Sequence, residues 1–401
     1  MAVQLVYDEA DADFGPAEIL QLLSCQMSGT AAGEGGRESA LEDVVKSWRG
    51  RRVFLTGHTG FKGSWLAFWL NQLGAQIGGY ALDPCTEPNL FNLASIGSVV
   101  DDVRGDIRDY ARLEASMKQF APEVVFHLAA QPIVRRSYAD PIGTYGTNVM
   151  GTVNVLEAVR KTPSVRAVVC VTTDKCYQNQ EWIWPYRETD TLGGYDPYAS
   201  SKACSEIVCA AFRSSFFPPE RFEEHHVALA TARAGNVIGG GDWSEDRLIP
   251  DLIRGFSSGQ PALIRRPDAI RPWQYVLDPL YGYILLAQRL LAQPGRFASA
   301  YNFGPGDEDV WPVERIANKV VSLWGNGASW VRDSVPSVHE DHVLRLDASK
   351  ARIELQWKPR LAIESALEWT VAWYRASTQG DNMAEFTRKQ VAAYELRSGT
   401  P

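Results

Sequence analysis

The sequence has few cysteines, six in 401 residues, and no two of them form a C-x-x-C pair. This pattern indicates neither a disulfide framework nor a zinc site, and we expect reduced thiols that are mostly buried. Long apolar runs are also missing, because none reaches the length of a membrane-spanning helix. The N-terminus lacks the basic segment and apolar core of a secretory signal. These absences predict a soluble cytoplasmic protein without a metal site.

Positive charge is not in excess either. The net charge of −8 argues against nucleic acid or an anionic membrane as a bulk partner, although a local basic pocket remains compatible with it. A length of 401 residues with 45% hydrophobic and 22% charged residues is ordinary for a globular enzyme with two lobes. Residues 1–45 include a Gly-rich polar run. We expect this extension to be disordered or to form one short helix outside the core fold.

A glycine-rich turn at residues 57–63 is the feature around which the chain is organised. The apolar run Val53–Leu55 is typical of a buried strand, and Gly57, Gly60 and Gly63 separate it from an amphipathic stretch. Such a strand, turn and helix offer backbone N–H groups to a pyrophosphate, although the bare pattern also fits an ordinary loop. Asp83 ends a second apolar strand, where a carboxylate commonly binds the adenosine ribose and repels a 2′-phosphate. We therefore predict an NAD site rather than an NADP site.

Strands and helices alternate between Trp48 and residue 235. The expected strands are 53–55, 77–82, 124–128, 167–172 and 227–232, and the expected helices include 110–120, 143–161 and 197–216. This alternation implies right-handed βαβ units and a mostly parallel sheet that is covered on both faces. We predict an α/β fold: a Rossmann-like doubly wound parallel sheet with a smaller C-terminal substrate-binding lobe.

The later part of the chain is rich in Gly, Pro and Arg, with shorter helices. A helix at 280–291 is expected to return to the first lobe, with Asp278 as its N-cap and Pro279 at its first position. The predicted domains are 46–235 with 273–292 for NAD binding, and 236–272 with 293–395 for the substrate.

The carboxyl ends of the predicted strands carry the candidate ligand contacts, because ligands of such sheets bind there. Asp106 could accept a hydrogen bond from the adenine amino group. The small residues Ala129 and Ala130, with Gln131, would let a cofactor lie against the backbone. The 167–172 strand ends in the polar run 172–175, so all candidates fall on one edge of the sheet.

Tyr198 and Lys202 are four residues apart and share one face of a helix. A phenol has a reference pKa near ~10, too high for a base at neutral pH. The ammonium of Lys202, together with a cationic nicotinamide ring, is expected to lower the pKa of Tyr198. Tyr-x-x-x-Lys also occurs by chance on exposed helix turns, but its place one strand after a dinucleotide turn favours a catalytic base.

These motifs together resemble a known family. The segments TGHTGFKG (56–63), HLAAQ (127–131), Asn148 and YASSK (198–202) resemble the extended short-chain dehydrogenase/reductase family of nucleotide-sugar enzymes. TTDK (172–175) and GGGDW (239–243) narrow the resemblance to the 4,6-dehydratases that act on CDP-glucose. The resemblance covers roughly residues 48–380.

The resemblance implies a set of cofactor contacts and a reaction. The NAD-binding candidates are Gly57, Thr59, Gly60, Phe61, Lys62, Gly63, Asp83, Asp106, Ile107, Leu128, Ala129, Ala130, Gln131, Asn148, Thr172, Tyr198 and Lys202. The catalytic candidates are Thr173, Asp174, Lys175, Tyr198 and Lys202. In the implied reaction Tyr198 removes the proton of the C4 hydroxyl, Thr173 binds O4, water leaves across C5 and C6, and NAD is regenerated in each cycle.

Asp174 stands where the related dehydratases keep their acid, and Lys175 where many of them have Glu. A neighbouring Lys⁺ lowers the pKa of a carboxyl, which does not suit an acid. Our hypothesis is that a site closed to water keeps Asp174 protonated and Lys175 neutral, with Lys175 as the base at C5. The alternative is an inert ion pair between the two side chains.

Substrate contacts are expected from the second lobe. Arg247 and Arg271 are candidates for the sugar-nucleotide pyrophosphate, although either could be a solvated surface charge. The other candidates are Gln131, Asn236 and Tyr275, and Tyr275 stands where the family pattern suggests His. His58, in the phosphate turn, is expected to contact cofactor or substrate.

Two alternative functions differ in their use of Asp174 and Lys175. A nucleotide-sugar 4-epimerase or reductase of the same family needs Tyr198, Lys202 and NAD but no pair for elimination. A non-catalytic NAD-binding scaffold would not need the complete set. CDP-glucose as substrate, and a homodimer or dimer of dimers formed through helices 143–161 and 197–216, follow from the resemblance alone.

Overall fold

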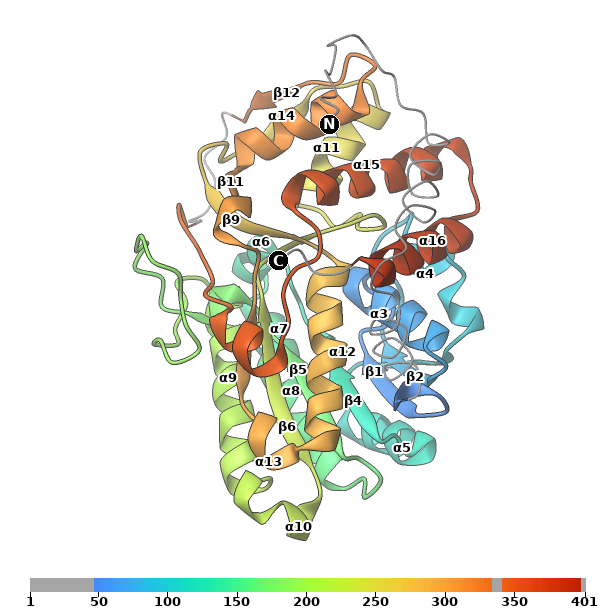
Figure 1. Cartoon of the computed structure of the whole chain (residues 1–401), viewed down its shortest axis with the longest axis vertical. Helices are drawn as coiled ribbons and strands as arrows, with labels where there is room; N and C mark the ends of the chain where they lie inside the picture. Colours follow the sequence, from blue (N-terminus) through green and yellow to red (C-terminus); the bar gives the residue numbers. More distant parts are fainter. Residues whose placement is uncertain (1–46, 334–340, 398–401) are drawn as a thin grey trace, which may run out of the picture.

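The computed structural model describes residues 47–333 and 341–397 (Figure 1). The predicted N-terminal extension at 1–45 lies outside these ranges. No helix within them is long and apolar enough to cross a membrane.

A seven-stranded parallel sheet forms the larger part of the molecule. Its strand order is β10-β6-β5-β4-β1-β2-β3. The strands are β1 (Arg52–Thr56), β2 (Gln76–Ala81), β3 (Asp101–Arg104), β4 (Val124–His127), β5 (Ala167–Val171), β6 (Ala228–Ala234) and β10 (Ala300–Phe303). Every neighbouring pair is parallel. The predicted doubly wound α/β fold is confirmed.

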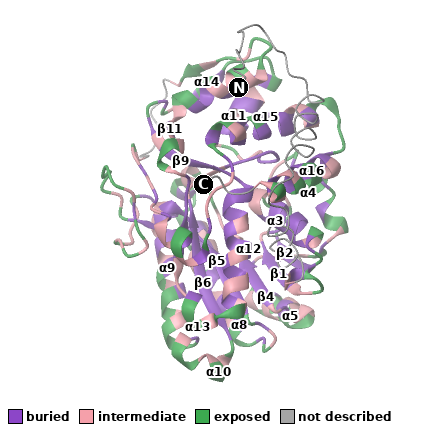
Figure 2. Ribbon diagram, viewed as in Figure 1, coloured by how far each residue is buried: buried purple, intermediate pink, exposed green. Residues whose placement is uncertain are grey.

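Helices cover both faces of this sheet. One face packs against α3 (Phe61–Gln72) and α12 (Leu277–Ala292), and the other against α5 (Tyr110–Phe120), α8 (Gly151–Arg160) and α9 (Pro197–Ser215). Every residue of β4, β5 and β6 is consequently buried (Figure 2). Burial on both faces explains why these strands read as apolar runs without alternation.

The helix expected at 143–161 is built from three consecutive segments. These are α7 (Pro141–Tyr145), the π-helical η2 (Gly146–Met150) and α8. Asp140 caps α7, because its carboxylate accepts from the backbone N–H of Gly143 at 2.8 Å. Asp196 caps α9 in the same way, through the N–H of Ala199 at 2.7 Å. Each such cap stabilises its helix by about 1 kcal/mol.

The predicted start of α12 is wrong. The helix begins at Leu277, so Asp278 lies inside its first turn and is not the N-cap. The Asp278 carboxylate is buried and accepts from the N–H of Arg360 and the hydroxyl of Tyr394, both at 2.7 Å. Burial raises the pKa of Asp278 to about 7. This side chain therefore ties the C-terminal segment to the main sheet.

The smaller lobe is built on two short sheets. The strands are β7 (Asn236–Ile238), β9 (Ile270–Tyr275) and β11 (Val310–Pro312) in one, and β8 (Ala262–Ile264) and β12 (Trp330–Arg332) in the other. The helices are α11 (Leu248–Ser257), α14 (Val313–Trp324), α15 (Ile363–Gln379) and α16 (Met383–Leu396). β10 follows residue 292 but is the edge strand of the main sheet, so part of the segment expected in the substrate lobe belongs to the first one.

Short helical segments complete the described chain. They are α4 (Leu90–Leu93), η1 (Ile96–Ser98), α6 (Val134–Ala139), η3 (Asp174–Cys176), η4 (Pro219–Arg221), α10 (Phe222–His225), α13 (Pro294–Phe297), η5 (Asp307–Asp309) and η6 (Ala351–Leu355). η3 directly follows β5, at the sheet edge that faces the smaller lobe (Figure 1).

Candidate active site

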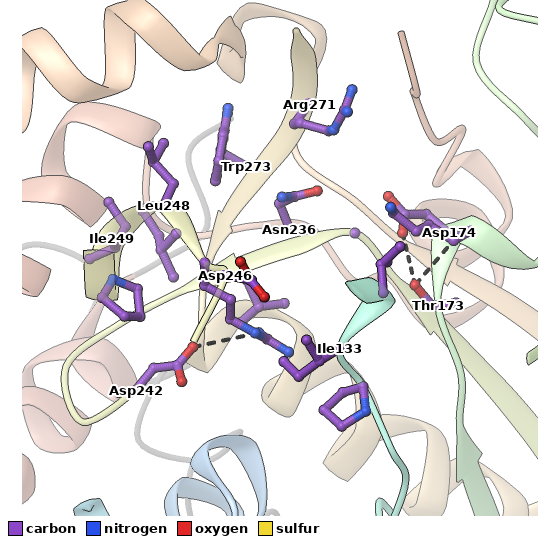
Figure 3. Close-up of a pocket in the computed structure, with 18 of the residues that line it drawn as sticks. Ile133, Thr173, Asp174, Asn236, Asp242, Asp246, Leu248, Ile249, Arg271 and Trp273 are labelled. Carbon is purple, nitrogen blue, oxygen red and sulfur yellow. Dashed lines mark hydrogen bonds and ion pairs between the residues drawn. The ribbon is translucent and has the colours of Figure 1, made fainter. Parts of the chain in front are cut away.

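A pocket of about 300 Å³ lies where the carboxyl ends of the main strands meet the smaller lobe. Many of the predicted site residues line it: Lys62, Leu128, Ala130, Thr172, Thr173, Asp174, Lys175, Tyr198, Lys202, Asn236, Arg247 and Arg271. Figure 3 shows Thr173 and Asp174 on one side of the pocket and Asp242 and Ile249 on the other. The structure thus brings together side chains that are up to 209 residues apart in the sequence, from Lys62 to Arg271.

The glycine turn has the geometry of a phosphate cradle. Gly57 has a φ of +79°, and a Cβ there would lie 2.7 Å from the backbone nitrogen of Ala129. A Cβ on Gly63 would overlap the carbonyl oxygen of Gly57, whereas one on Gly60 would meet only that oxygen, at 3.5 Å. Gly57 therefore allows the turn, Gly63 allows α3 to pack against it, and Gly60 leaves the backbone open at the helix start. These are the three glycine roles of a dinucleotide-binding turn.

The expected adenosine end of the site is acidic. The side chain of Asp83 is 88% exposed, and Arg104 contacts it at 3.3 Å while also pairing with Asp102 at 2.8 Å. The carboxylate of Asp106 pairs with Arg108 at 2.6 Å, which lowers the pKa of Asp106. An exposed carboxylate at Asp83 suits a ribose hydroxyl and opposes a 2′-phosphate.

Other residues predicted to bind the cofactor have structural partners. The hydroxyl of Thr59 donates to the carbonyl of Leu82 at 2.9 Å. Ile107 is buried and faces Gly151 of α8, where a Cβ would overlap the Ile107 side chain. Phe61 is partly buried against the main core.

His58 does not contact the pocket, contrary to expectation. Its imidazole is fully buried beneath β2, with Nε2 2.9 Å from a carboxylate oxygen of Asp102. A Cβ at Gly79 would lie 2.6 Å from the ring, so that glycine makes room for it. Burial lowers the pKa of His58, although Asp102 acts in the opposite direction. His58 therefore has a structural role beneath the glycine turn.

Asn148 is hydrogen-bonded within the protein through both groups of its amide. Its Nδ2 donates to the carbonyl of Gln131 at 3.1 Å and to the hydroxyl of Ser201 at 2.8 Å. Its Oδ1 accepts from the N–H of Gln131 at 2.8 Å. The Gln131 amide in turn bonds Thr144 and the N–H of Ile133. Asn148 therefore holds the 131 loop against α9 from behind the site.

Asp174 has the features of a buried acid. One carboxylate oxygen accepts from the hydroxyl of Thr173 at 2.9 Å, and the other is buried without a partner among the described residues. Burial raises the pKa of Asp174, which outweighs the lowering by Thr173, Lys175 and Arg271. Within the described chain no ion pair joins Asp174 to Lys175. The effect of the neighbouring lysine on the pKa of Asp174 is thus smaller than that of burial.

Tyr198 and Lys202 are both buried on α9, facing the end of β5. The ammonium of Lys202 donates to the carbonyl of Val171 at 3.1 Å. Burial raises the pKa of Tyr198 to about 12, although hydrogen bonding with Thr173 and the charge of Arg247 act against it. The expected lowering by Lys202 is therefore wrong for the protein alone, because desolvation of the phenolate dominates.

Lys62 lines the same pocket from the start of α3. Burial, together with the positive charges of Arg247 and Lys202, lowers the pKa of its ammonium to about 7. A lysine at this position can change its charge near neutral pH. The sequence predicted that Lys62 lies in the phosphate turn, but it did not indicate that the pKa of its ammonium is lowered.

The two predicted arginines lie on the substrate-lobe side of the pocket. Arg271 is buried, and its guanidinium donates to the carbonyls of Ile270, Asp341 and His342. Arg247 lies 3.5 Å from Asp242. Arg271 and Trp273 lie beside each other in Figure 3, above Asn236.

An ion cluster at the pocket rim was missed by the sequence analysis. Asp246 contacts Arg265 at 2.7 Å and Arg135 at 3.3 Å, and so connects the smaller lobe to α6. Its φ of +59° is uncommon for a residue other than glycine. No spacing in the sequence indicated this pairing, because its three members come from separate elements.

Tyr275 is not a substrate contact. It is fully buried, and its hydroxyl donates to the amide oxygen of Gln390 at 2.9 Å. The ring packs edge-on against Trp65 and Trp369, behind the pocket. Tyr275, which stands where the family pattern suggests His, is therefore a core residue and does not line the pocket.

The chain matches the GDP-mannose 4,6 dehydratase family over residues 54–370. It is 52% identical over 347 residues to a CDP-glucose 4,6-dehydratase of Salmonella typhimurium, covering 86% of this chain and 97% of the relative. It is also similar to the solved dTDP-glucose 4,6-dehydratase of Streptomyces venezuelae with NAD bound, with a TM-score of 0.69, 25% identity, and coverage of 82% and 98%. An epimerase of Methanothermobacter thermautotrophicus shares the fold, with a TM-score of 0.71, 24% identity, and coverage of 84% and 96%.

Proposed function

Since this chain belongs to the GDP-mannose 4,6-dehydratase family, we propose that it is an NAD-dependent dehydratase converting CDP-glucose into CDP-4-keto-6-deoxyglucose. The observation that carries the proposal is the buried, partly unpartnered carboxyl of Asp174 beside Thr173, in one pocket with Tyr198. A 4-epimerase needs no such acid. The choice of CDP-glucose rests on the 52% identity to the Salmonella enzyme.

The glycine turn and Asp83 are the groups that would hold NAD, which supplies a hydride acceptor for C4 and a donor for C6. The open backbone at Gly60 would hold the pyrophosphate, and the ammonium of Lys202 would bind the nicotinamide ribose. Tyr198 takes the proton of the C4 hydroxyl through its phenolate oxygen, and Thr173 is hydrogen-bonded at O4.

Water elimination is assigned to the two residues that follow Thr173. Asp174 protonates the departing C6 hydroxyl through its buried carboxyl, whose raised pKa favours the protonated form. Lys175 removes the C5 proton through its amine. The half-buried position of Lys175 at the pocket wall supports this role, as does the missing ion pair with Asp174 among the described residues.

Incubation with a panel of sugar nucleotides tests the proposed function. CDP-glucose is expected to yield a 4-keto-6-deoxy product, detected by its alkaline absorbance, while dTDP-, UDP- and GDP-hexoses yield much less. Formation of a C4 epimer without loss of water would assign the chain to the epimerases instead. No product from any sugar nucleotide would contradict the dehydratase assignment.

We further propose that the chain forms a homodimer, or a dimer of such dimers, through α7, η2 and α9. α7 packs against α9, and together these segments carry the exposed apolar side chains Ile142, Met150 and Ile207. Exposed apolar side chains on helices that pack together fit a subunit interface.

If the proposed interface forms, introducing a charged side chain into it should lower the mass of the protein assembly in solution. Ile142 is 86% exposed in the single chain. The variant Ile142→Asp is expected to sediment as a monomer in analytical ultracentrifugation, because dimer formation would bury an unpaired carboxylate at the interface. Ile353→Asp is the matched control, since Ile353 is 78% exposed and lies on η6, which is not part of the proposed interface. A wild-type protein that sediments as a monomer would refute the proposal.

A further inference from the structure

A buried carboxylate lies directly behind the catalytic residues. Glu206 is on α9, one turn after Lys202, and is 3% exposed. One of its oxygens accepts from the hydroxyl of Thr172. The other accepts from the hydroxyl of Thr231 and the guanidinium of Arg233, both at 2.8 Å. A single carboxylate therefore joins α9 to the ends of β5 and β6.

We propose that Glu206 is a positioning residue of the active site: it fixes the strand end that carries Thr173 and Asp174, and it places a negative charge one helical turn from Lys202. This inference rests on the proposed function, because it assigns Glu206 to the same reaction.

Two contacts one residue apart attach the end of β5 to α9. The carbonyl of Val171 accepts from Lys202 at 3.1 Å, and the hydroxyl of Thr172 donates to Glu206. Thr173 and Asp174 follow immediately, so their placement relative to Tyr198 depends on these two attachments. Catalytic groups whose positions are fixed by hydrogen-bonded neighbours lose rate when the neighbours are removed.

Arg233, the ion-pair partner of Glu206, is itself held by further hydrogen bonds. Arg233 donates to the hydroxyl of Tyr177 at 2.8 Å, and Tyr177 donates to Asn302 at 2.7 Å. Burial alone would lower the pKa of Arg233, but the carboxylate of Glu206 raises it overall. The pair is therefore ionised, and the Glu206 carboxylate has one fixed orientation.

The charge of Glu206 also acts on Lys202. Burial lowers the pKa of Lys202, and Glu206 is the first of the groups that oppose this lowering. The other titratable groups facing Lys202 are the thiols of Cys170, Cys176 and Cys209, the imidazole of His127 and the ammonium of Lys62. Those facing Glu206 are Arg233, Arg213, Cys176, Cys209 and Lys202. The charge of Glu206 thus opposes, without cancelling, the effect of burial on the Lys202 ammonium.

Three single variants separate the two roles. Thr172→Val removes the attachment and keeps the carboxylate, and it is expected to lower kcat by about tenfold or more with KM for CDP-glucose nearly unchanged. Glu206→Gln keeps the side-chain shape and removes the charge. It is expected to lower kcat and also to move the titration of Lys202 to lower pH by roughly one unit, measured by NMR of isotope-labelled lysine. Glu157→Gln, a surface ion-pair partner on α8, is the control.

The lysine titration distinguishes failure of this inference from failure of the proposed function. If wild-type protein does not turn over CDP-glucose, the dehydratase assignment fails while the Lys202 shift still tests Glu206. An unchanged Lys202 titration and unchanged kcat in Glu206→Gln would overturn the inference, even if the variant unfolds at lower temperature. Should Glu206→Gln not fold because Arg233 is left unpaired, Glu206→Leu with Arg233→Met removes both charges. Wild-type kcat in that folded double variant would likewise overturn it.

Discussion

Replacing Tyr198 with phenylalanine is expected to lower kcat for CDP-glucose dehydration by about 10²–10⁴-fold, because the proton of the C4 hydroxyl then has no acceptor. The variant should unfold at nearly the same temperature as the wild type. Tyr198 is buried, but its hydroxyl bonds only within the catalytic group, through Thr173. Steady-state kinetics and thermal unfolding measure the two expectations. Tyr138→Phe, an exposed tyrosine on α6, is the matched control.

The pH dependence follows from the direction of the Tyr198 shift. Burial raises the pKa of the phenol to about 12, so at neutral pH the protein alone favours the protonated form, which cannot accept a proton. The active phenolate becomes more abundant as pH rises, and kcat/KM should therefore increase with pH on the acidic side of the profile. Tyr198→Phe should lack this increase. A phenylalanine variant with wild-type rate and pH profile would contradict the assignment of Tyr198 as the base.

Most strands of the main sheet could be predicted from the sequence, because burial on both faces requires apolar residues within the strand itself. A strand covered on both faces is mostly apolar, and the runs 53–55 in β1, 124–126 in β4 and Ala167–Val171 of β5 meet this condition. β10 was missed because its four residues, AYNF, are polar enough and short enough to resemble a loop. Its place in the sheet is decided by pairing with β6, which is a contact between distant segments.

The positions of the site candidates could be predicted from the sequence where spacing fixes geometry, and could not where packing fixes it. Tyr198 and Lys202 face one pocket because a four-residue spacing places them on one helix face. Tyr275 follows Gln274 in a motif-like segment, yet strand alternation and α16 place it in the core. Asp278 was misassigned for a related reason, because its partner Arg360 is distant in sequence, and the pairing of Asn148 with Gln131 left no local pattern either.

Asp174→Asn is expected to stop water elimination while leaving C4 oxidation possible. The amide has nearly the same shape but carries no transferable proton, so the C6 hydroxyl cannot leave as water, and dehydration should fall by about 10²–10⁴-fold. Burial raises the pKa of Asp174, so the wild-type acid keeps its proton to higher pH than an exposed carboxyl, and activity declines only as pH rises past that raised pKa. The variant should show no such decline. Mass spectrometry of the quenched reaction should find an oxidised sugar nucleotide that has not lost water.

Incorporation of solvent deuterium at C5 distinguishes the role of the acid from the role of the base. In Asp174→Asn, Lys175 still removes the C5 proton, and recovered sugar nucleotide should gain deuterium without forming product. In Lys175→Ala the exchange itself should be lost, because the amine that carries the proton is missing. The two variants would then both lack product but differ in label. Undiminished exchange in Lys175→Ala would rule out Lys175 as the base, and normal dehydration by Asp174→Asn would rule out its carboxyl as the acid.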